Sequence, residues 1–256
     1  MPGAALSQPI PRPTPTPSGG GGGTAPGGGG TTPGGSGNIR GTSRPDSLTG
    51  TGGADLIFGL EAPDTIFGAA GNDTAYGDEG DDSIRGDGGN DCLLGGAGSD
   101  TGLGSAGDDT VFGGRGSDSL LGDEGNDVLL GGQDSDIMSG GAGNDTFFGG
   151  SGDDSLLGGV GDDCLSGDRG RDTLIGGDGN DTFVIGRQAD GDLFADYTDG
   201  VDRIRLSAGL TFSELTISAG TAGTSPTTII QLTSTKETLA IIGVARNSIT
   251  QADFIF

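Results

Sequence analysis

Aspartate recurs at every ninth residue over more than half of this chain. The series has sixteen members and no gap. Carboxylates ligate hard cations through oxygen, and calcium takes about six to eight oxygen ligands. Because so strict a period places side chains at equivalent points of a repeating structure, the first chemistry that the sequence suggests is cation binding. The series is Asp46, Asp55, Asp64, Asp73, Asp82, Asp91, Asp100, Asp109, Asp118, Asp127, Asp136, Asp145, Asp154, Asp163, Asp172 and Asp181.

Each of these aspartates is the sixth residue of a nine-residue unit, and sixteen units fill residues 41–184. Position 1 is Gly in every copy, and position 4 is Gly in thirteen, the exceptions being Arg44, Ala62 and Asp134. Position 5 is Asn or Asp in nine copies, which suits left-handed turn geometry. Glycine permits positive φ and close backbone approach. Positions 1 to 6 therefore predict a turn with one carboxylate and several unshielded carbonyl oxygens.

Positions 7 to 9 predict a three-residue strand whose middle side chain points inward. Position 8 is apolar in fourteen copies and falls to Ala75 and Gly102 in the other two. Two strands and two turns would close one coil, so odd and even copies would build two parallel sheets around a thin core. We expect Gly102 to leave a local gap. The inward residues would be Leu48, Ile57, Ile66, Ile84, Leu93, Val111, Leu120, Leu129, Met138, Phe147, Leu156, Leu165, Leu174 and Phe183.

The unit follows the pattern G-G-x-G-x-D-x-U-x, and on these residues the chain resembles the RTX (repeats-in-toxin, hemolysin-type calcium-binding) family. The resemblance covers 144 of the 256 residues. It implies an all-β fold, a right-handed parallel β-roll, which is a β-solenoid with two repeats per turn. It also implies calcium ions between the turns of copies n and n+2, so that Asp145 would share an ion with the turn of Asp163.

Sixteen copies make fourteen such pairs, and four pairs contain a turn without Gly at position 4. The remaining ten pairs predict roughly ten ions, with fourteen as the ceiling. Glycines at positions 1 and 4 would supply main-chain oxygens to the metal sites. The glycines assigned to this role are Gly68, Gly71, Gly77, Gly80, Gly86, Gly89, Gly95, Gly98, Gly104, Gly107, Gly113, Gly116, Gly122, Gly125, Gly140, Gly143, Gly149, Gly152, Gly158 and Gly161.

Charge supports the same interpretation. The net charge of the chain is −25, and the repeats hold 29 acidic and 5 basic residues, a difference of −24. Nucleic acid and anionic membranes are poor partners for such a surface, whereas small cations are good ones. We therefore expect a disordered polyanion without calcium and folding on calcium binding. The alternative is that the aspartates only cap turns through hydrogen bonds.

The flanking regions have a different composition. Residues 1–40 hold eight of the eleven prolines and long glycine runs, which predicts a disordered tail or a linker. Residues 185–256 lack the nonapeptide and predict a C-terminal β cap on the open solenoid edge. Within it, residues 192–206 resemble the strand that follows the repeats in many RTX proteins. Further predicted strands are residues 215–218, 227–232 and 239–244.

The route out of the cell is a separate prediction. Residues 1–17 lack the basic and apolar regions of a signal peptide, and no apolar run is long enough to span a membrane. The C-terminal Asp253-Phe254-Ile255-Phe256 resembles the end of a type I secretion signal in the RTX family, although an ordinary last strand is the alternative. We therefore expect a secreted, extracellular protein whose partners are calcium ions and the type I secretion apparatus.

Catalysis is not expected, because the chain has no histidine for a HExxH zinc site or a Ser-His-Asp triad. Two other hypotheses remain. The chain could be the calcium-dependent module of a larger exoenzyme or toxin. An apolar stripe at position 9, including Phe58, Tyr76 and Phe112, could instead mark a surface-layer or adhesive component that self-associates or attaches to a surface. Cys92 and Cys164 lie eight repeats apart, and we expect two free thiols.

Overall fold

The computed structural model describes residues 37–187, 191–207, 209–222, 225–233, 238–242 and 249–255. The predicted tail over residues 1–36 lies outside the described residues. Within these ranges, strands make up almost all of the regular structure, and the helical elements are two short 3₁₀ turns, η1 (Phe212–Glu214) and η2 (Gln251–Asp253). None of the described residues belongs to a helix with the length and apolar character to cross a bilayer. The predicted all-β solenoid is confirmed.

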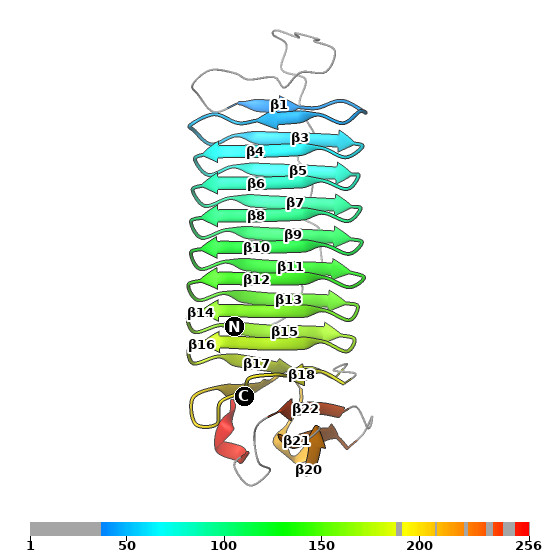
Figure 1. Ribbon diagram of the computed structural model, residues 1–256, viewed down its shortest axis with the longest axis vertical. Coiled ribbons are helices and arrows are strands. Elements are labelled where there is room, and N and C mark those ends of the chain that lie inside the picture. Colours follow the sequence, from blue (N-terminus) through cyan, green and yellow to red (C-terminus); the bar gives the residue numbers. More distant parts are fainter. Residues whose placement is uncertain are drawn as a thin grey trace.

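One sheet of the solenoid contains eleven strands in the described part of the chain, and the strands of the even-numbered copies lie in it (Figure 1). Adjacent repeat strands are parallel and eighteen residues apart, as in the pairing of Ile57 with Ala75. In spatial order the strands are β1 (Asn38–Arg40), β3 (Leu56–Glu61), β5 (Thr74–Glu79), β7 (Cys92–Ala97), β9 (Thr110–Arg115), β11 (Val128–Gln133), β13 (Thr146–Ser151), β15 (Cys164–Arg169), β17 (Thr182–Ile185), β19 (Arg203–Leu206) and β23 (Phe254–Ile255).

The second sheet holds the odd-numbered copies and contains twelve strands, counted over the residues that the structure describes. It is parallel through the repeats and ends in an antiparallel group formed by its last three strands. In spatial order the strands are β2 (Ser47–Thr49), β4 (Thr65–Ala70), β6 (Ser83–Gly88), β8 (Thr101–Ala106), β10 (Ser119–Glu124), β12 (Ile137–Ala142), β14 (Ser155–Val160), β16 (Thr173–Asp178), β18 (Leu193–Phe194), β22 (Thr238–Ile242), β21 (Ser225–Leu232) and β20 (Leu215–Ala222).

Most repeat strands are longer than the sequence predicts. The strands β3 to β16 have six residues each, covering positions 7 to 9 of one copy and 1 to 3 of the next. Their registers skip position 1, so that Phe58 pairs with Tyr76 and Leu60 with Asp78, but the intervening glycines do not pair. Identical turns stacked eighteen residues apart continue the hydrogen bonding beyond the expected three residues. The turn is thereby confined to positions 4 to 6.

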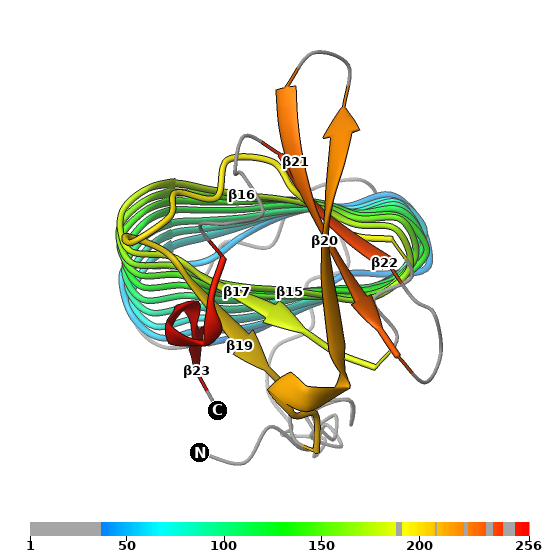
Figure 2. The ribbon, with the colours of Figure 1, turned by 90° about the horizontal axis from the view of Figure 1, so that it is seen from below.

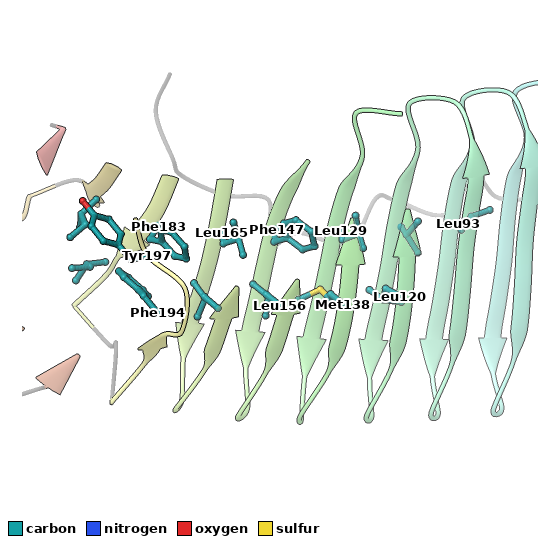
Figure 3. Close-up of a cluster of buried hydrophobic side chains, with 14 of the residues drawn as sticks. Leu93, Leu120, Leu129, Met138, Phe147, Leu156, Leu165, Phe183, Phe194 and Tyr197 are labelled. Atoms are coloured by element: carbon teal, nitrogen blue, oxygen red, sulfur yellow. The ribbon is translucent and has the colours of Figure 1, made fainter. Parts of the chain in front are cut away.

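The core is a double row of position 8 side chains, as predicted (Figure 3). All fourteen apolar residues at this position are at most 3% exposed. The expected gap at Gly102 is wrong, because a Cβ on this residue would lie 2.6 Å from Val111 Cγ1 and 3.4 Å from Leu120 Cδ2. Neighbouring side chains thus occupy the space in a core that is only two side chains thick.

The ends of the solenoid differ from the predicted boundaries. Strand β1 precedes the first copy and buries Ile39 in the core, so the roll begins before residue 41. Asn38, Ile39 and Arg40 have the residue pattern of positions 7 to 9, which a search for the glycines of a full unit does not detect. The single strand expected over residues 192–206 is divided between the two sheets as β18 and β19.

The C-terminal β cap is present in the described residues. Strands β20 and β21 cross the end of the roll (Figure 2), and β20 to β22 overlap the three strands predicted there, while residues 243 and 244 lie outside the described part. Phe254 and Ile255 form a last strand that pairs with β19. Cys92 and Cys164 are free thiols, as predicted.

Candidate metal centre

The chain turns between the two sheets along both edges of the roll (Figure 1). The sixteen position 6 aspartates lie in these turns and form two columns, one for the odd-numbered and one for the even-numbered copies. Within a column, the backbone N–H of each aspartate from Asp46 to Asp163 donates to the carboxylate eighteen residues further on. Asp109 N lies 2.7 Å from Asp127 Oδ1, and Asp127 N lies 2.8 Å from Asp145 Oδ1. The pairing of copy n with copy n+2 places these side chains together as the sequence predicts, and fifteen of them are buried, all except Asp46.

The second carboxylate oxygen is left without a donor in most of these residues. Thirteen position 6 aspartates, from Asp64 to Asp172, have a buried Oδ2 with no hydrogen-bond partner in the part of the chain that the structure describes. A buried charged oxygen without a partner costs several kcal/mol. Thirteen such atoms at equivalent points indicate a ligand that the protein atoms alone do not supply.

A main-chain oxygen approaches ten of these thirteen carboxylates beside the glycine at position 1. A Cβ placed on Gly68 would lie 2.6 Å from Asp73 Oδ2 and 2.7 Å from the carbonyl oxygen of Gly86. On Gly149 it would lie 2.5 Å from Asp154 Oδ2 and 2.6 Å from the carbonyl oxygen of Gly167. A carboxylate of copy n and a carbonyl of copy n+2 therefore converge on one point that only glycine leaves open.

The backbone of each copy from the third onward has two left-handed residues. Position 4 has positive φ in every such copy, including Ala62 at 77° and Asp134 at 70°. Position 2 is also left-handed in these copies, for example Leu60 at 94°. Glycine at position 4 also allows successive turns of a column to stack closely, because a Cβ on Gly80 would lie 2.5 Å from the carbonyl carbon of Ala62 in the preceding turn. Two turns that seemed imperfect by sequence thus keep the common conformation.

Position 5 has a different role from the one expected. None of its Asn or Asp residues has positive φ in the described structure, so tolerance of left-handed geometry does not explain them. Their side chains instead accept hydrogen bonds from the next turn: Asn126 N donates to Asp108 Oδ1 at 2.9 Å, and Asn144 N donates to Asn126 Oδ1 at 2.9 Å. This exposed ladder runs in the opposite sense to the buried one, so each turn is tied to both of its neighbours.

Sequence reasoning missed four residues of the columns. Asp172 N donates to Asp192 Oδ1 at 3.1 Å and Asp181 N to Asp202 Oδ1 at 3.0 Å, which extends both columns past the last full copy. A D-x-U-x pattern at residues 192–195 and 202–205 carries the signal, but insertions change the spacing from 18 to 20 and 21 residues. At the other end, Thr42 and Thr51 donate to the aspartates of their own turns.

In the absence of a cation, burial raises the pKa of aspartates in both columns. Desolvation raises the pKa of Asp64 to about 6 and the pKa of Asp100 and Asp163 to about 7. The backbone donor of the preceding turn lowers these pKa values, while stacked carboxylates such as Asp82 and Asp118 beside Asp100 raise them further. A positive ion between the turns would offset the cost of burying the charged carboxylates and would reduce the repulsion between them.

The donor set fits calcium better than a metal that needs nitrogen or sulfur. In the described residues, no three His, Cys, Asp or Glu side chains meet at a point that could hold a metal. Main-chain carbonyls would have to complete any site, and calcium accepts carboxylate and carbonyl oxygens in flexible geometry. The assignment of individual aspartates and glycines as ligands stays a prediction.

The fold and the paired columns define a calcium-binding β-roll. A family model described as the RTX calcium-binding nonapeptide repeat (4 copies) matches residues 34–66, 59–93, 67–102, 94–129, 103–138, 130–165 and 158–191. These matches cover well over half of the chain, which therefore belongs to this family. The predicted family and the predicted metal, calcium, are confirmed. No curated protein matches the sequence.

Two solved structures are similar to parts of the chain. The AlgE6R3 subunit of the mannuronan C5-epimerase of Azotobacter vinelandii is 23% identical over 64% of this chain and 81% of that chain, with a TM-score of 0.32. The extracellular lipase LipA of Serratia marcescens is 16% identical over 86% of this chain and 42% of that chain, with a TM-score of 0.29. The present chain thus spans less than half of the lipase, and neither likeness bears on its activity.

Proposed function

We propose that this chain is a secreted, non-catalytic calcium-binding protein whose repeats fold on binding calcium outside the cell. The observation that carries the proposal is the set of thirteen buried aspartate Oδ2 atoms that have no hydrogen-bond donor among the described residues. In this proposal, each internal aspartate and the glycine carbonyls of its own and the stacked turn hold the ion. Asp73, Gly68 and Gly86 illustrate the arrangement.

Calcium binding would supply folding free energy that the core cannot. Each repeat contributes a single side chain to the core, and the repeats carry a charge of −24 (5 basic minus 29 acidic residues). A thin core gives little hydrophobic stabilisation against chain entropy and like-charge repulsion. Because the paired turns do not exist in the unfolded chain, binding and folding would be one event.

Export in the unfolded state follows from the same coupling. Sites of weak to moderate affinity would be empty at cytosolic calcium concentrations and filled at extracellular ones, which are about millimolar. The C-terminal residues 253–256 would serve the type I secretion apparatus. The alternative, a calcium-dependent module of a larger exoenzyme or toxin, requires the same folding event and differs only in what precedes the repeats.

The test is far-UV circular dichroism of the full chain, freed of metal and titrated with calcium to about 10 mM, with magnesium as the control. We expect a cooperative change from coil to β structure with calcium alone. A β-rich spectrum in the absence of calcium, unchanged on its addition, would overturn the proposal. The aspartate columns would then have a capping role only.

An exposed apolar patch on the second sheet favours calcium-dependent self-association as a second function. Ile137 is 64% exposed, Val160 58% and Leu157 42%, and these side chains belong to the neighbouring strands β12 and β14. Position 7 is Ser or Thr in all the other odd-numbered copies, so Ile137 is not needed for the fold. Light scattering recorded during the calcium titration should show association that Ile137→Ser weakens. A monomer at every calcium concentration would exclude this function.

A further inference from the structure

In the first two copies of the repeat, hydrogen-bond donors of the protein occupy the Oδ2 atom of the position 6 aspartate. In the first copy, Thr42 N lies 2.6 Å and Thr42 Oγ1 2.9 Å from Asp46 Oδ2. In the second, Thr51 N lies 2.6 Å and Thr51 Oγ1 2.8 Å from Asp55 Oδ2. The Oδ2 atom that lacks a partner in thirteen later turns therefore accepts two hydrogen bonds here.

A change of backbone conformation accompanies these hydrogen bonds. No described residue before Leu60 has positive φ, whereas positions 2 and 4 are left-handed in every later copy. In the first two turns the N–H of position 2 points at the carboxylate and the threonine hydroxyl joins it. Hydrogen-bond donors thus surround the oxygen that would face a cation, and their positive ends oppose cation binding.

The C-terminal end repeats part of this arrangement. Thr198 N donates to Asp202 Oδ2 at 2.6 Å, with the same T-x-x-x-D spacing as Thr42 with Asp46 and Thr51 with Asp55. Asp202 is also the carboxylate that accepts from Asp181 N, so it is the next member of one column. Turns in which a threonine donates to the aspartate Oδ2 therefore lie at both ends of the series of thirteen aspartates whose Oδ2 has no donor in the described structure.

We propose that Thr42 and Thr51 make the first two turns cation-free caps and that metal loading begins at the turn of Asp64. The proposal rests on the proposed function and refines it. The residue at position 2, rather than the glycine at position 4, decides which turns bind a cation. The second copy has glycine at positions 1 and 4 as well as Asp55, yet Thr51 occupies the carboxylate oxygen that would bind the ion. Cation-free caps would hold the end strands in place while the internal turns load.

The test compares two aspartates at the same position and on the same edge of the roll. Full chains with Asp55→Asn or Asp127→Asn are dialysed against millimolar calcium, and bound calcium is counted by elemental analysis. We expect Asp55→Asn to bind as many ions as the wild type and Asp127→Asn to bind at least one fewer. Circular dichroism in calcium checks that both variants are folded.

The outcomes separate this proposal from the proposed function. Equal losses in the two variants would overturn the threonine caps and leave calcium-dependent folding intact. A wild type that binds no calcium would overturn both. A gain-of-site variant gives independent evidence: Thr42→Gly with Thr51→Gly should bind more calcium than the wild type. A folded double variant with unchanged calcium content would contradict closure of these turns by threonine.

Discussion

At the scale of single residues, the conformation of a turn depends on two left-handed positions more than on the identity of any side chain. Ala62 adopts a φ of 77° where thirteen other copies have glycine. A Cβ in the left-handed region costs about 1–2 kcal/mol. The stacked turn eighteen residues further on imposes this strain, because its Gly80 is left-handed in the same way and packs directly against Ala62.

Ala62→Gly should therefore stabilise the calcium-loaded roll. We expect a gain of up to about 1 kcal/mol, since relief of the left-handed Cβ exceeds the entropy that glycine adds to the unfolded chain. Denaturant unfolding in saturating calcium measures the change. Ala70→Gly is the matched control, because Ala70 is exposed and does not have positive φ, and it should be neutral or slightly destabilising. Equal effects of the two substitutions would show that Ala62 is unstrained.

At the scale of strands and turns, the period of nine predicts most of the architecture. It gives the two sheets, the inward face at position 8 and the aspartate columns, because each follows from repeating one geometry. It does not give strand length, which depends on hydrogen bonds between turns that no local pattern encodes. Asp192 and Asp202 escaped detection for a related reason, because insertions break the period while the stacking continues.

Packing within the core could not be predicted from the sequence. The pattern shows a missing side chain at Gly102, but whether this leaves a gap depends on Val111 from the facing sheet, whose Cγ1 lies 2.6 Å from where a Cβ would be. The hydrogen bonds that occupy the carboxylates of the end turns could not be predicted either, because they depend on the directions of the Thr51 N–H and hydroxyl group. In both cases the deciding feature is a contact across the roll or a backbone rotation.

Gly102→Leu tests the packing directly. A gap would make this substitution stabilising, since leucine is the commonest residue at position 8. The position of Val111 instead predicts overpacking and a loss of roughly 1–3 kcal/mol in unfolding free energy. The double variant Gly102→Leu with Val111→Ala should recover much of the loss, because it exchanges volume between facing positions. A stabilised single variant would show that the core can accommodate the side chain after all.

At the scale of the whole molecule, the roll is a stack of carboxylates in which protons and calcium are alternative counter-charges. The folded pKa is about 6 for Asp118 and Asp127 and about 7 for Asp109 and Asp136, against 3.8 for an ordinary aspartate. Burial is the largest cause in each case. The folded form therefore binds more protons than the unfolded chain between about pH 4 and pH 7.

Without calcium, the roll should gain stability as the pH falls from 8 towards 5. Each raised pKa imposes a penalty on folding that is complete above the folded pKa, decreases as the pH falls below it, and vanishes only near pH 4, where the unfolded carboxylates are protonated as well. With calcium present the sign reverses, because protons displace the cation, so the calcium concentration at half-folding should rise as the pH falls through 7 to 6. Circular dichroism titrations at a series of pH values measure both effects.

A matched pair of variants assigns the pH dependence to the buried column. Asp109→Asn removes a carboxylate with a raised pKa, so it should reduce the dependence in calcium-free buffer. Asp108→Asn changes the adjacent exposed residue, whose pKa is lowered by hydrogen bonds from Asn126, and should leave the dependence below pH 8 nearly unchanged. If acidification destabilised the calcium-free roll, or if the two variants behaved alike, protons would not be replacing calcium between the turns.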